Sequence, residues 1–243
     1  MTKIEVDRSV CLIDIQMIQT DLSHVNPFFG LFGNFLKSFL PFMKERFIDM
    51  DKKESAKERI LQVASELFYQ EGIRAVGIDR IIAESGVAKA SFYRNFATKD
   101  DLIVAFLEQR FLISLERIEE ARQRFPNQPI EQLRFLFQSI SDRMKEPDFR
   151  GCPYMNTAVE FPDIEHPAHA KAVASRHILW CHVKQMATEA GARDPEALAS
   201  QLEILHSGAI MMAYMKKSMY NADHFYNAAM LLIKDQVPSV SIR

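Results

Sequence analysis

The segment Gly86-Val-Ala-Lys-Ala-Ser-Phe-Tyr-Arg-Asn-Phe-Ala-Thr-Lys99 decides the fold that we expect for this chain. A helix turns by about 100° per residue, so Ala88, Phe92 and Phe96 fall on one face of a helix through this segment. The apolar side chains at 78–83 predict a preceding helix on which this face packs. A helix of about nine residues is too short to persist alone in water, so neighbouring helices must hold it in place.

The opposite face of the same helix is polar and basic. It carries small, polar and basic residues: Lys89, Ala90, Ser91, Tyr93, Arg94 and Asn95. No Asp or Glu occurs in the whole segment, which carries the three positive charges of Lys89, Arg94 and Lys99. Two short helices joined by a glycine turn, with a basic outer face on the second, are typical of a helix-turn-helix that reads the major groove.

The pattern Gly86-Val-x-Lys-x-Ser-x-Tyr-Arg-x-Phe-x-x-Lys99-x-Asp-Leu102 resembles the DNA-binding signature of TetR-family transcriptional regulators. The resemblance extends from about Ala56 to Leu107. It implies an all-α fold, with an N-terminal three-helix helix-turn-helix domain and a C-terminal six-helix domain for ligand sensing and dimerisation. The sequence departs from the family at Gly77, where a hydroxyl residue usually caps the second helix, although the charge of Asp79 still favours the start of that helix.

The resemblance also implies which side chains meet DNA. They lie in the third helix and at the start of the fourth: Lys89, Ala90, Ser91, Tyr93, Arg94, Asn95 and Lys99. We expect Tyr93 and Lys99 to contact phosphates. Lys89, Ser91 and Asn95 are better placed to read bases, and Arg94 suits either role or solvent. The alternative is a helical hairpin whose polar face is merely solvated.

Composition favours an all-helical globular protein of one or two domains. The 243 residues are 48% apolar and 26% charged, and the net charge of −2 does not itself indicate a nucleic-acid partner. The three cysteines have no metal-type spacing, which favours a reducing cytoplasm over a disulfide scaffold. No uninterrupted apolar run of about eighteen residues occurs, so we expect no membrane partner.

We predict three parts: an atypical N-terminal extension at 1–50, a helix-turn-helix DNA-binding domain at 51–98, and an effector-binding and dimerisation domain at 99–243. Seven of the eighteen phenylalanines lie between Phe28 and Phe47. Residues 1–50 have three interpretations, which are a start set too far upstream, an arm that packs on the rest of the protein, and a membrane-surface helix.

Local signals divide the remaining residues into nine helices. Ser55-x-x-Glu58 is a capping box before a first helix that ends near Gly72, and the second covers about Ile78–Ser85. Thr98, with Asp101 three residues on, is the expected N-cap of a long fourth helix that ends near Arg124. The other five helices are expected at Ile130–Lys145, from Cys152 to Phe161, at His166–Glu189, from Asp194 to Lys217, and at Ala222–Lys234.

The last two long helices carry many small and methionine residues, which favour close helix packing. They are Ala199, Ser207, Gly208, Ala209, Met211, Met212, Ala213, Ala228, Ala229 and Met230. In the family such helices pair with those of a second subunit. The resemblance therefore implies a homodimer that binds a palindromic operator, with packing inside one subunit as the alternative.

The family binds its small-molecule effector among the fourth to eighth helices, in a largely apolar pocket. Aromatic, polar and sulfur-containing residues of this region are the candidates: Phe111, Phe135, Cys152, Tyr154, Asn156, Glu160, His177, Trp180 and Cys181. Each of them also fits an ordinary place in the core. We expect Trp180, the chain's lone tryptophan, to be able to stack on a ligand.

The function that we predict is a DNA-binding transcriptional regulator, most simply a repressor that an unknown small molecule releases from its operator. One alternative is a thiol sensor, because a helix N-terminus and the nearby Arg150 would lower the pKa of Cys152, although a buried inert cysteine is the other interpretation. A metal-binding enzyme is the third, using His166 with His169 or His177 with Cys181. The sequence has no phosphate-binding glycine loop or nucleophile elbow, so we predict no enzyme, no metal and no cofactor.

Overall fold

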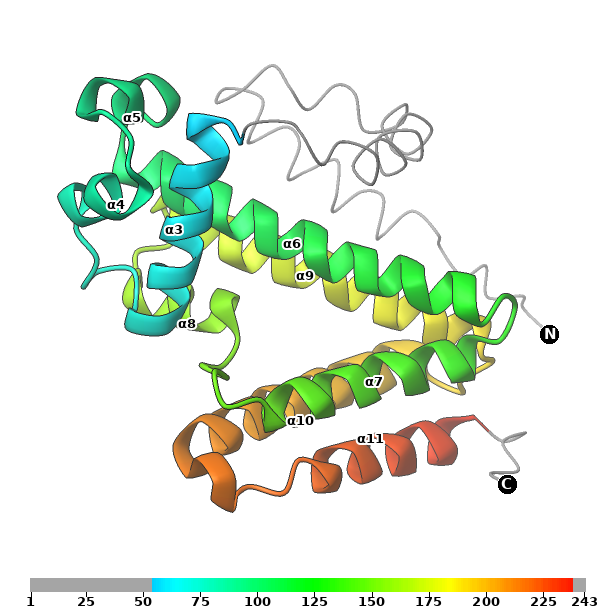
Figure 1. Cartoon of the computed structure of the whole chain (residues 1–243). Coiled ribbons are helices and arrows are strands. Elements are labelled where there is room, and N and C mark those ends of the chain that lie inside the picture. The colour runs from blue at the N-terminus through cyan, green and yellow to red at the C-terminus, as the bar shows by residue number, and fades with distance from the viewer. Residues whose placement is uncertain (1–53, 238–243) are drawn as a thin grey trace. The chain divides into compact units, whose positions relative to one another are not determined.

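The computed structural model describes residues 54–237, so the predicted extension at 1–50 lies outside the described residues. Within 54–237 the chain is all-α, with nine α-helices, one 3₁₀ turn and no strand (Figure 1). In chain order they are α3 (Ala56–Glu71), α4 (Ile78–Ser85), α5 (Lys89–Asn95), α6 (Lys99–Arg124), α7 (Pro129–Lys145), α8 (Pro153–Glu160), α9 (Pro167–Glu189), α10 (Pro195–Lys216), η2 (Lys217–Met219) and α11 (Asp223–Gln236). The predicted all-α fold is confirmed.

The first three helices, α3 to α5, form a small bundle around a common apolar core. The turn between α4 and α5 places Gly86 in the left-handed region at φ +62, a conformation that glycine adopts without steric cost. Phe92 is fully buried and Phe96 is 3% exposed, as predicted. Ala88 is exposed, because it is the extended N-cap residue of a helix of only seven residues, and Val87 fills the core instead.

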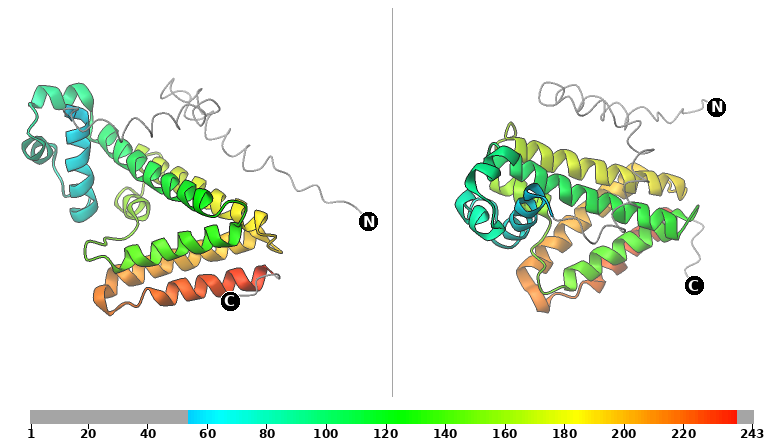
Figure 2. Two further views of the ribbon diagram at one scale, coloured as in Figure 1. Left: turned by 45° about the vertical axis from the view of Figure 1, so that its right-hand side comes forward. Right: turned by 45° about the horizontal axis from the view of Figure 1, so that its top comes forward.

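Helix α6 connects this bundle to the rest of the protein. Its predicted start is confirmed: Thr98 Oγ1 accepts a hydrogen bond from the Asp101 backbone N–H, and the Asp101 carboxylate accepts one from the Thr98 backbone. Phe106 of α6 packs edge-on against Phe68 of α3 at 5.7 Å. Farther along, α6 lies beside α9 in both views (Figures 1 and 2). The single helix α6 therefore contacts both the α3–α5 bundle and the C-terminal helices.

The C-terminal helices begin and end within about two residues of the predicted positions. Helix α11 packs against both α7 and α10, and α9 packs against α6, α7 and α10 (Figure 1). Proline follows the N-cap residue of α7, α8, α9 and α10, where its fixed φ suits the first turn and no N–H is required. Within the part of the chain that the structure describes, every helix is too short or too polar to span a lipid bilayer.

The small and methionine residues of α10 and α11 divide into three groups. Ala199, Ala209, Ala213 and Ala229 are buried inside the subunit, where they pack in its own core. Ser207, Ala228 and Met230 are half-buried, and Gly208, Met211 and Met212 are exposed. Packing inside the subunit therefore accounts for the four buried alanines, and the exposed residues belong to the outer face of these helices.

Candidate DNA-binding surface and ligand cavity

The outer face of α5 presents the predicted side chains to solvent. Tyr93 is 44% exposed, and its ring stands edge-on to the buried Phe92 at 5.3 Å, which fixes its direction. Ala90 and Arg94 are exposed. The Asn95 side-chain amide donates to the Ser91 carbonyl at 2.8 Å, so these two half-buried residues support the helix as well as border the face.

Lys89 lies at the start of this face and pairs with Asp79 of α4. Their Nζ and Oδ1 atoms are 3.1 Å apart, and both side chains are largely exposed. The hydrogen bond to Asp79 raises the pKa of Lys89, so the ammonium stays charged. An exposed pair of this kind contributes little to stability, which leaves Lys89 able to exchange its partner for DNA.

Lys99 is directed into the protein. Its Nζ donates to the Ile73 carbonyl at 2.6 Å and lies 5.8 Å from the centre of the Phe68 ring. Burial lowers the pKa of Lys99, and the charge of Glu160 opposes that shift. In this structure Lys99 ties the start of α6 to the α3–α4 loop, which is not the arrangement that we expected for a phosphate contact.

A cavity of about 360 Å³ lies among α6 to α10. Its wall is mostly apolar and includes Ile113, Ile118, Leu136, Phe137, Ile140, Phe149, Leu179, Trp180, Val183 and Ile210. Cys152, Tyr154 and Trp180 were predicted there and do line it. A pocket of this size, mostly apolar with a few polar groups, is typical of a small-molecule site.

The other six predicted effector residues lie outside the cavity wall. Phe111 packs beneath Lys171, and Phe135 contacts Phe125. The Asn156 amide donates to the Arg150 carbonyl at 2.9 Å. The Nε2 of His177 and the Sγ of Cys181 are 3.6 Å apart, away from the cavity on α9. The sixth residue, Glu160, reaches the DNA-binding bundle, as described below.

Of the two interpretations of Cys152, the structure favours the buried, inert cysteine over the thiol sensor. Burial raises the pKa of the Cys152 thiol, although nearby backbone groups and Arg176 act in the opposite direction. The guanidinium beside it belongs to Arg176, whose Nη1 is 3.8 Å from Sγ, whereas Arg150 lies over the Tyr214 ring at 5.3 Å. A buried thiol with a raised pKa lacks the thiolate character that a redox or electrophile sensor requires.

Sequence reasoning missed eight polar residues of the cavity wall: Tyr69, Arg110, Ser114, Arg117, Ser139, Arg143, Arg176 and His206. His206 stands edge-on to Trp180 at 5.5 Å, and burial together with the charge of Arg176 lowers its pKa to about 3, so the imidazole is neutral. The buried Arg110 Nε, Tyr154 hydroxyl and His206 Nδ1 have no hydrogen-bond partner within residues 54–237. All three residues line the same cavity, so one polar group bound there would supply the missing partners.

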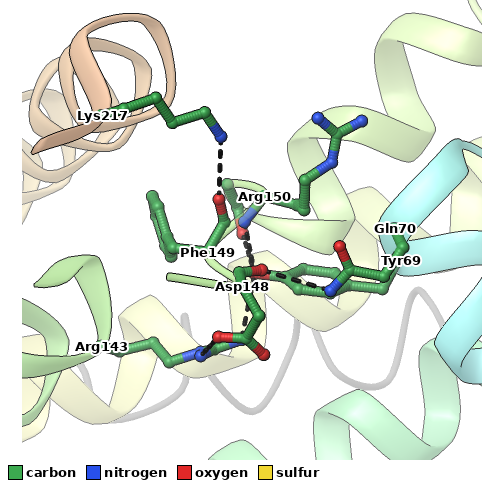
Figure 3. Close-up of polar contacts among 8 residues, drawn as sticks. Tyr69, Gln70, Arg143, Asp148, Phe149, Arg150 and Lys217 are labelled. Carbon is green, nitrogen blue, oxygen red and sulfur yellow. Dashed lines mark hydrogen bonds and ion pairs between the residues drawn. The ribbon is translucent and has the colours of Figure 1, made fainter. Parts of the chain in front are cut away.

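Tyr69 joins the α3–α5 bundle to the loop between α7 and α8 (Figure 3). Its hydroxyl accepts from the Arg150 backbone N–H at 3.0 Å and donates to the Gly151 carbonyl at 3.3 Å. Beside it, Gln70 donates to the Asp148 carbonyl at 3.3 Å. The end of α3 is therefore attached to the α7–α8 loop, part of which lines the cavity.

The same loop is fixed from the other direction. Arg143 of α7 forms an ion pair with Asp148 at 2.5 Å, and Lys217 donates to the Phe149 carbonyl at 3.2 Å (Figure 3). The loop thus connects α3, α7 and the end of α10. Part of the same loop lines the cavity, so α3 is attached to a segment of the cavity wall.

Glu160, at the end of α8, makes a second attachment to the bundle. Its carboxylate accepts from the backbone N–H groups of Ile73 at 3.1 Å and Arg74 at 2.8 Å, in the α3–α4 loop. Gly72 has φ +92, a left-handed conformation that residues with a side chain rarely adopt, so this loop favours a glycine. Within residues 54–237, no cluster of three or more His, Cys, Asp or Glu is placed to hold a metal ion.

Two short helices with a basic, exposed outer face, carried on a buried aromatic core, define a helix-turn-helix DNA-binding protein. Residues 60–106 match the family model described as bacterial regulatory proteins of the tetR family. Residues 129–229 match the one described as the Tetracyclin repressor-like C-terminal domain.

Three known proteins illustrate the relationship. The chain is 24% identical over 193 residues to the uncharacterized HTH-type transcriptional regulator YxaF of Bacillus subtilis, covering 78% of this chain and 96% of that protein. It is 25% identical over 169 residues to the transcriptional regulator AcuR of Cereibacter sphaeroides, covering 66% and 77%. The crystal structure of SCO4454, a TetR-family transcriptional regulator from Streptomyces coelicolor, has a TM-score of 0.71 at 34% identity, covering 75% of this chain and 96% of that one.

The chain therefore belongs to the TetR family of transcriptional regulators. The family and these relatives are regulators of transcription and not enzymes.

Proposed function

We propose that this protein is a repressor. In this proposal a homodimer in the cytoplasm binds a palindromic operator through the two copies of α5 and leaves it when a small molecule occupies the cavity. The observation that carries the proposal is the position of Tyr69, which belongs to the DNA-binding bundle and also forms part of the cavity wall. A ligand in the cavity touches the bundle directly, so it can favour one position of the bundle over another.

The exposed side chains of α5 support the operator-binding part of the proposal. Lys89, Ser91 and Asn95 remain our candidates for base reading, and Tyr93 for phosphate contact. Lys99 keeps that role only if DNA draws its ammonium away from the Ile73 carbonyl. Three basic side chains on or beside α5 also imply that binding weakens as salt rises.

A stripe of apolar residues on α10 supports the homodimer. Ile204 is 73% exposed, Met211 47% and Met215 69%, and Gly208 lies open between them. The spacing of four, three and four residues keeps these positions on one helical face, and Leu231 of α11 adds a further side chain that is 68% exposed. Contiguous exposed apolar surface marks an interaction site, and a second copy of the same two helices matches it in shape and chemistry.

The proposal is tested first on DNA. An operator is selected from randomised duplexes by repeated binding and amplification, and affinity is measured by fluorescence anisotropy. Lys89→Ala should weaken operator binding about tenfold or more and loosen sequence preference. Lys234→Ala, which removes an exposed lysine of α11, should leave it unchanged. Failure of the wild-type protein to select any sequence, or equal behaviour of the two variants, would contradict the DNA-binding assignment.

The repressor role is tested in cells. A reporter promoter that contains the selected operator should be transcribed more strongly when the protein is deleted. Stronger transcription in the presence of the protein would identify an activator instead. A half-site spacing of about ten base pairs, or a multiple of it, is the expected geometry for a two-fold dimer.

A further inference from the structure

All the charged side chains of the cavity wall are positive. Four arginines contribute to it, Arg110, Arg117, Arg143 and Arg176, and no Asp or Glu does. Three of them have carboxylate partners outside the wall, which are Glu120 at 3.7 Å from Arg117, Asp148 beside Arg143, and Glu203 at 2.9 Å from Arg176. Arg110 differs, because no carboxylate within residues 54–237 lies within ion-pair distance of it.

Arg110 is held in place by aromatic rings rather than by a counter-charge. Its guanidinium lies 5.1 Å from the centre of the Tyr69 ring and 5.5 Å from that of Phe106. Its one hydrogen bond within the described residues is a long one, 3.4 Å, to the Ser65 carbonyl, and its buried Nε has no partner. Arginine remains protonated at neutral pH, so an unpaired positive charge faces the cavity. A buried charge without a partner is costly, and a bound anion removes that cost.

A second polar group lies in the same part of the wall. Tyr154 is 5% exposed, and its hydroxyl has no hydrogen-bond partner within residues 54–237. Burial raises the pKa of Tyr154, while the neighbouring Ser114 hydroxyl and the charge of Arg110 act in the other direction. Tyr154 and Arg110 both line the same cavity, and a neutral hydroxyl together with a guanidinium supplies donors suited to an oxyanion.

The rest of the cavity wall is apolar and suits the hydrocarbon part of a ligand. Trp180, Leu136, Phe137 and Ile140 supply aromatic and aliphatic surface. The cavity volume is about 360 Å³. Since a water molecule takes about 30 Å³ of the liquid, this volume corresponds to roughly a dozen non-hydrogen atoms.

We propose that the cavity binds a small aliphatic or aryl-alkyl carboxylate of about ten to thirteen non-hydrogen atoms, whose carboxylate is held by Arg110 and Tyr154. The planar guanidinium matches a carboxylate in two parallel hydrogen bonds, and the apolar chain lies against Trp180. This inference rests on the proposed function, because it names the chemical class of the effector that the same cavity would take.

The experiment compares each carboxylate with its carboxamide, which has the same number of non-hydrogen atoms but no charge. The pairs are octanoate and octanamide, 3-phenylpropanoate and 3-phenylpropanamide, and 4-phenylbutanoate and 4-phenylbutanamide. Trp180 is the only tryptophan of the chain, so its fluorescence reports binding at the cavity, and calorimetry gives the affinity. In at least one pair the carboxylate should bind about tenfold more tightly, as expected for a hydrogen bond to a charged group.

Arg110→Met should reduce the preference for that carboxylate to near unity, whereas Arg124→Met, on the same helix and outside the cavity wall, should leave it unchanged. Tyr154→Phe should weaken carboxylate binding several-fold and amide binding less. Should Arg110→Met not fold by circular dichroism, Arg110→Lys replaces it, and a reduced but measurable preference is then expected, because the charge remains without the planar fork.

Equal affinity for carboxylate and carboxamide in every pair, no binding of any carboxylate, or a preference that survives Arg110→Met and Tyr154→Phe would overturn the inference. DNA release is measured separately on the selected operator. Release by the neutral amides alone would support the proposed function and refute this inference. Carboxylate binding that depends on Arg110 without any release would support the inference and refute effector control.

Discussion

Removing the Tyr69 hydroxyl should weaken the attachment of α3 to the α7–α8 loop. That hydroxyl makes three hydrogen bonds: it accepts from the Arg150 backbone N–H at 3.0 Å and from Arg143 Nη2 at 3.5 Å, and it donates to the Gly151 carbonyl at 3.3 Å. The two with backbone groups contribute about 0.5–1.5 kcal/mol each and the long one from Arg143 adds little, so Tyr69→Phe should lower the free energy of unfolding by about 1–3 kcal/mol. The ring remains, together with its packing against Arg110 and Arg143, so the variant should still fold.

The same substitution should reduce the effect of a cavity ligand on operator binding. If the ligand acts through this attachment, the hydroxyl carries part of a coupling free energy that is commonly about 1–3 kcal/mol in allosteric proteins. Loss of about 1 kcal/mol corresponds to a roughly fivefold smaller change in operator affinity. Operator affinity without ligand should change less, because the outer face of α5 is untouched.

Urea unfolding followed by circular dichroism measures the first effect, and anisotropy on the selected operator, with and without saturating carboxylate, measures the second. Tyr226→Phe is the matched control, since the Tyr226 hydroxyl makes no hydrogen bond within residues 54–237. If Tyr69→Phe and Tyr226→Phe show the same unfolding free energy and the same response to ligand, the attachment has no part in the coupling and the reasoning fails.

Three further substitutions address the other features of the structure. Met211→Glu puts a charge in the middle of the exposed α10 stripe and should convert the homodimer to a monomer, as measured by light scattering. Lys216→Glu, near the end of α10, should leave the dimer intact. A monomeric wild-type protein would contradict the proposed interface. His206→Gln should reduce the fall in the free energy of unfolding on the acid side of its pH profile. The folded-state pKa of His206, about 3, is below the unfolded value near 6.5, so the stability associated with the neutral histidine is fully present above pH 6.5 and is lost progressively below it. An unchanged profile from pH 7 to pH 4 would exclude this role. Cys152 should react slowly with iodoacetamide at pH 7.5 in the folded protein, because burial raises the pKa of its thiol. Mass spectrometry should show faster labelling of the half-buried Cys181. Faster labelling of Cys152 than of Cys181 would restore the thiol-sensor alternative.

The DNA-binding bundle could be predicted from sequence because its signals are local. The capping box of Thr98 and Asp101 and the turn at Gly86 each depend on residues within a few positions of one another, and Phe92 and Phe96 follow from helical periodicity. The contact of Ala88 was misjudged for a local reason too, since the helix begins one residue later than the spacing suggested.

The cavity could not be predicted in the same way, because its wall comes from five or more helices and depends on their packing. Phe111 was expected there, yet its neighbour Arg110 faces the cavity, and one residue along a helix changes the direction of a side chain by about 100°. Tyr69 was assigned to the DNA-binding domain, and no periodicity indicates that its hydroxyl reaches a loop some eighty residues away. The two interpretations of Cys152 could not be separated from sequence, because the burial that raises the pKa of its thiol depends on the packing of several helices.

Ile73, in the α3–α4 loop, makes backbone hydrogen bonds with two charged side chains. Its carbonyl accepts a hydrogen bond from the Lys99 ammonium, and its N–H donates one to the Glu160 carboxylate. Dissolved ions that screen the attraction between DNA and α5 also screen these two internal contacts. The decline of operator affinity with rising ionic strength therefore has two causes, the release of counterions from DNA and the weakening of these two contacts within the protein. The slope alone overstates the number of phosphates contacted. A parallel titration of the Glu160→Gln protein separates the two causes.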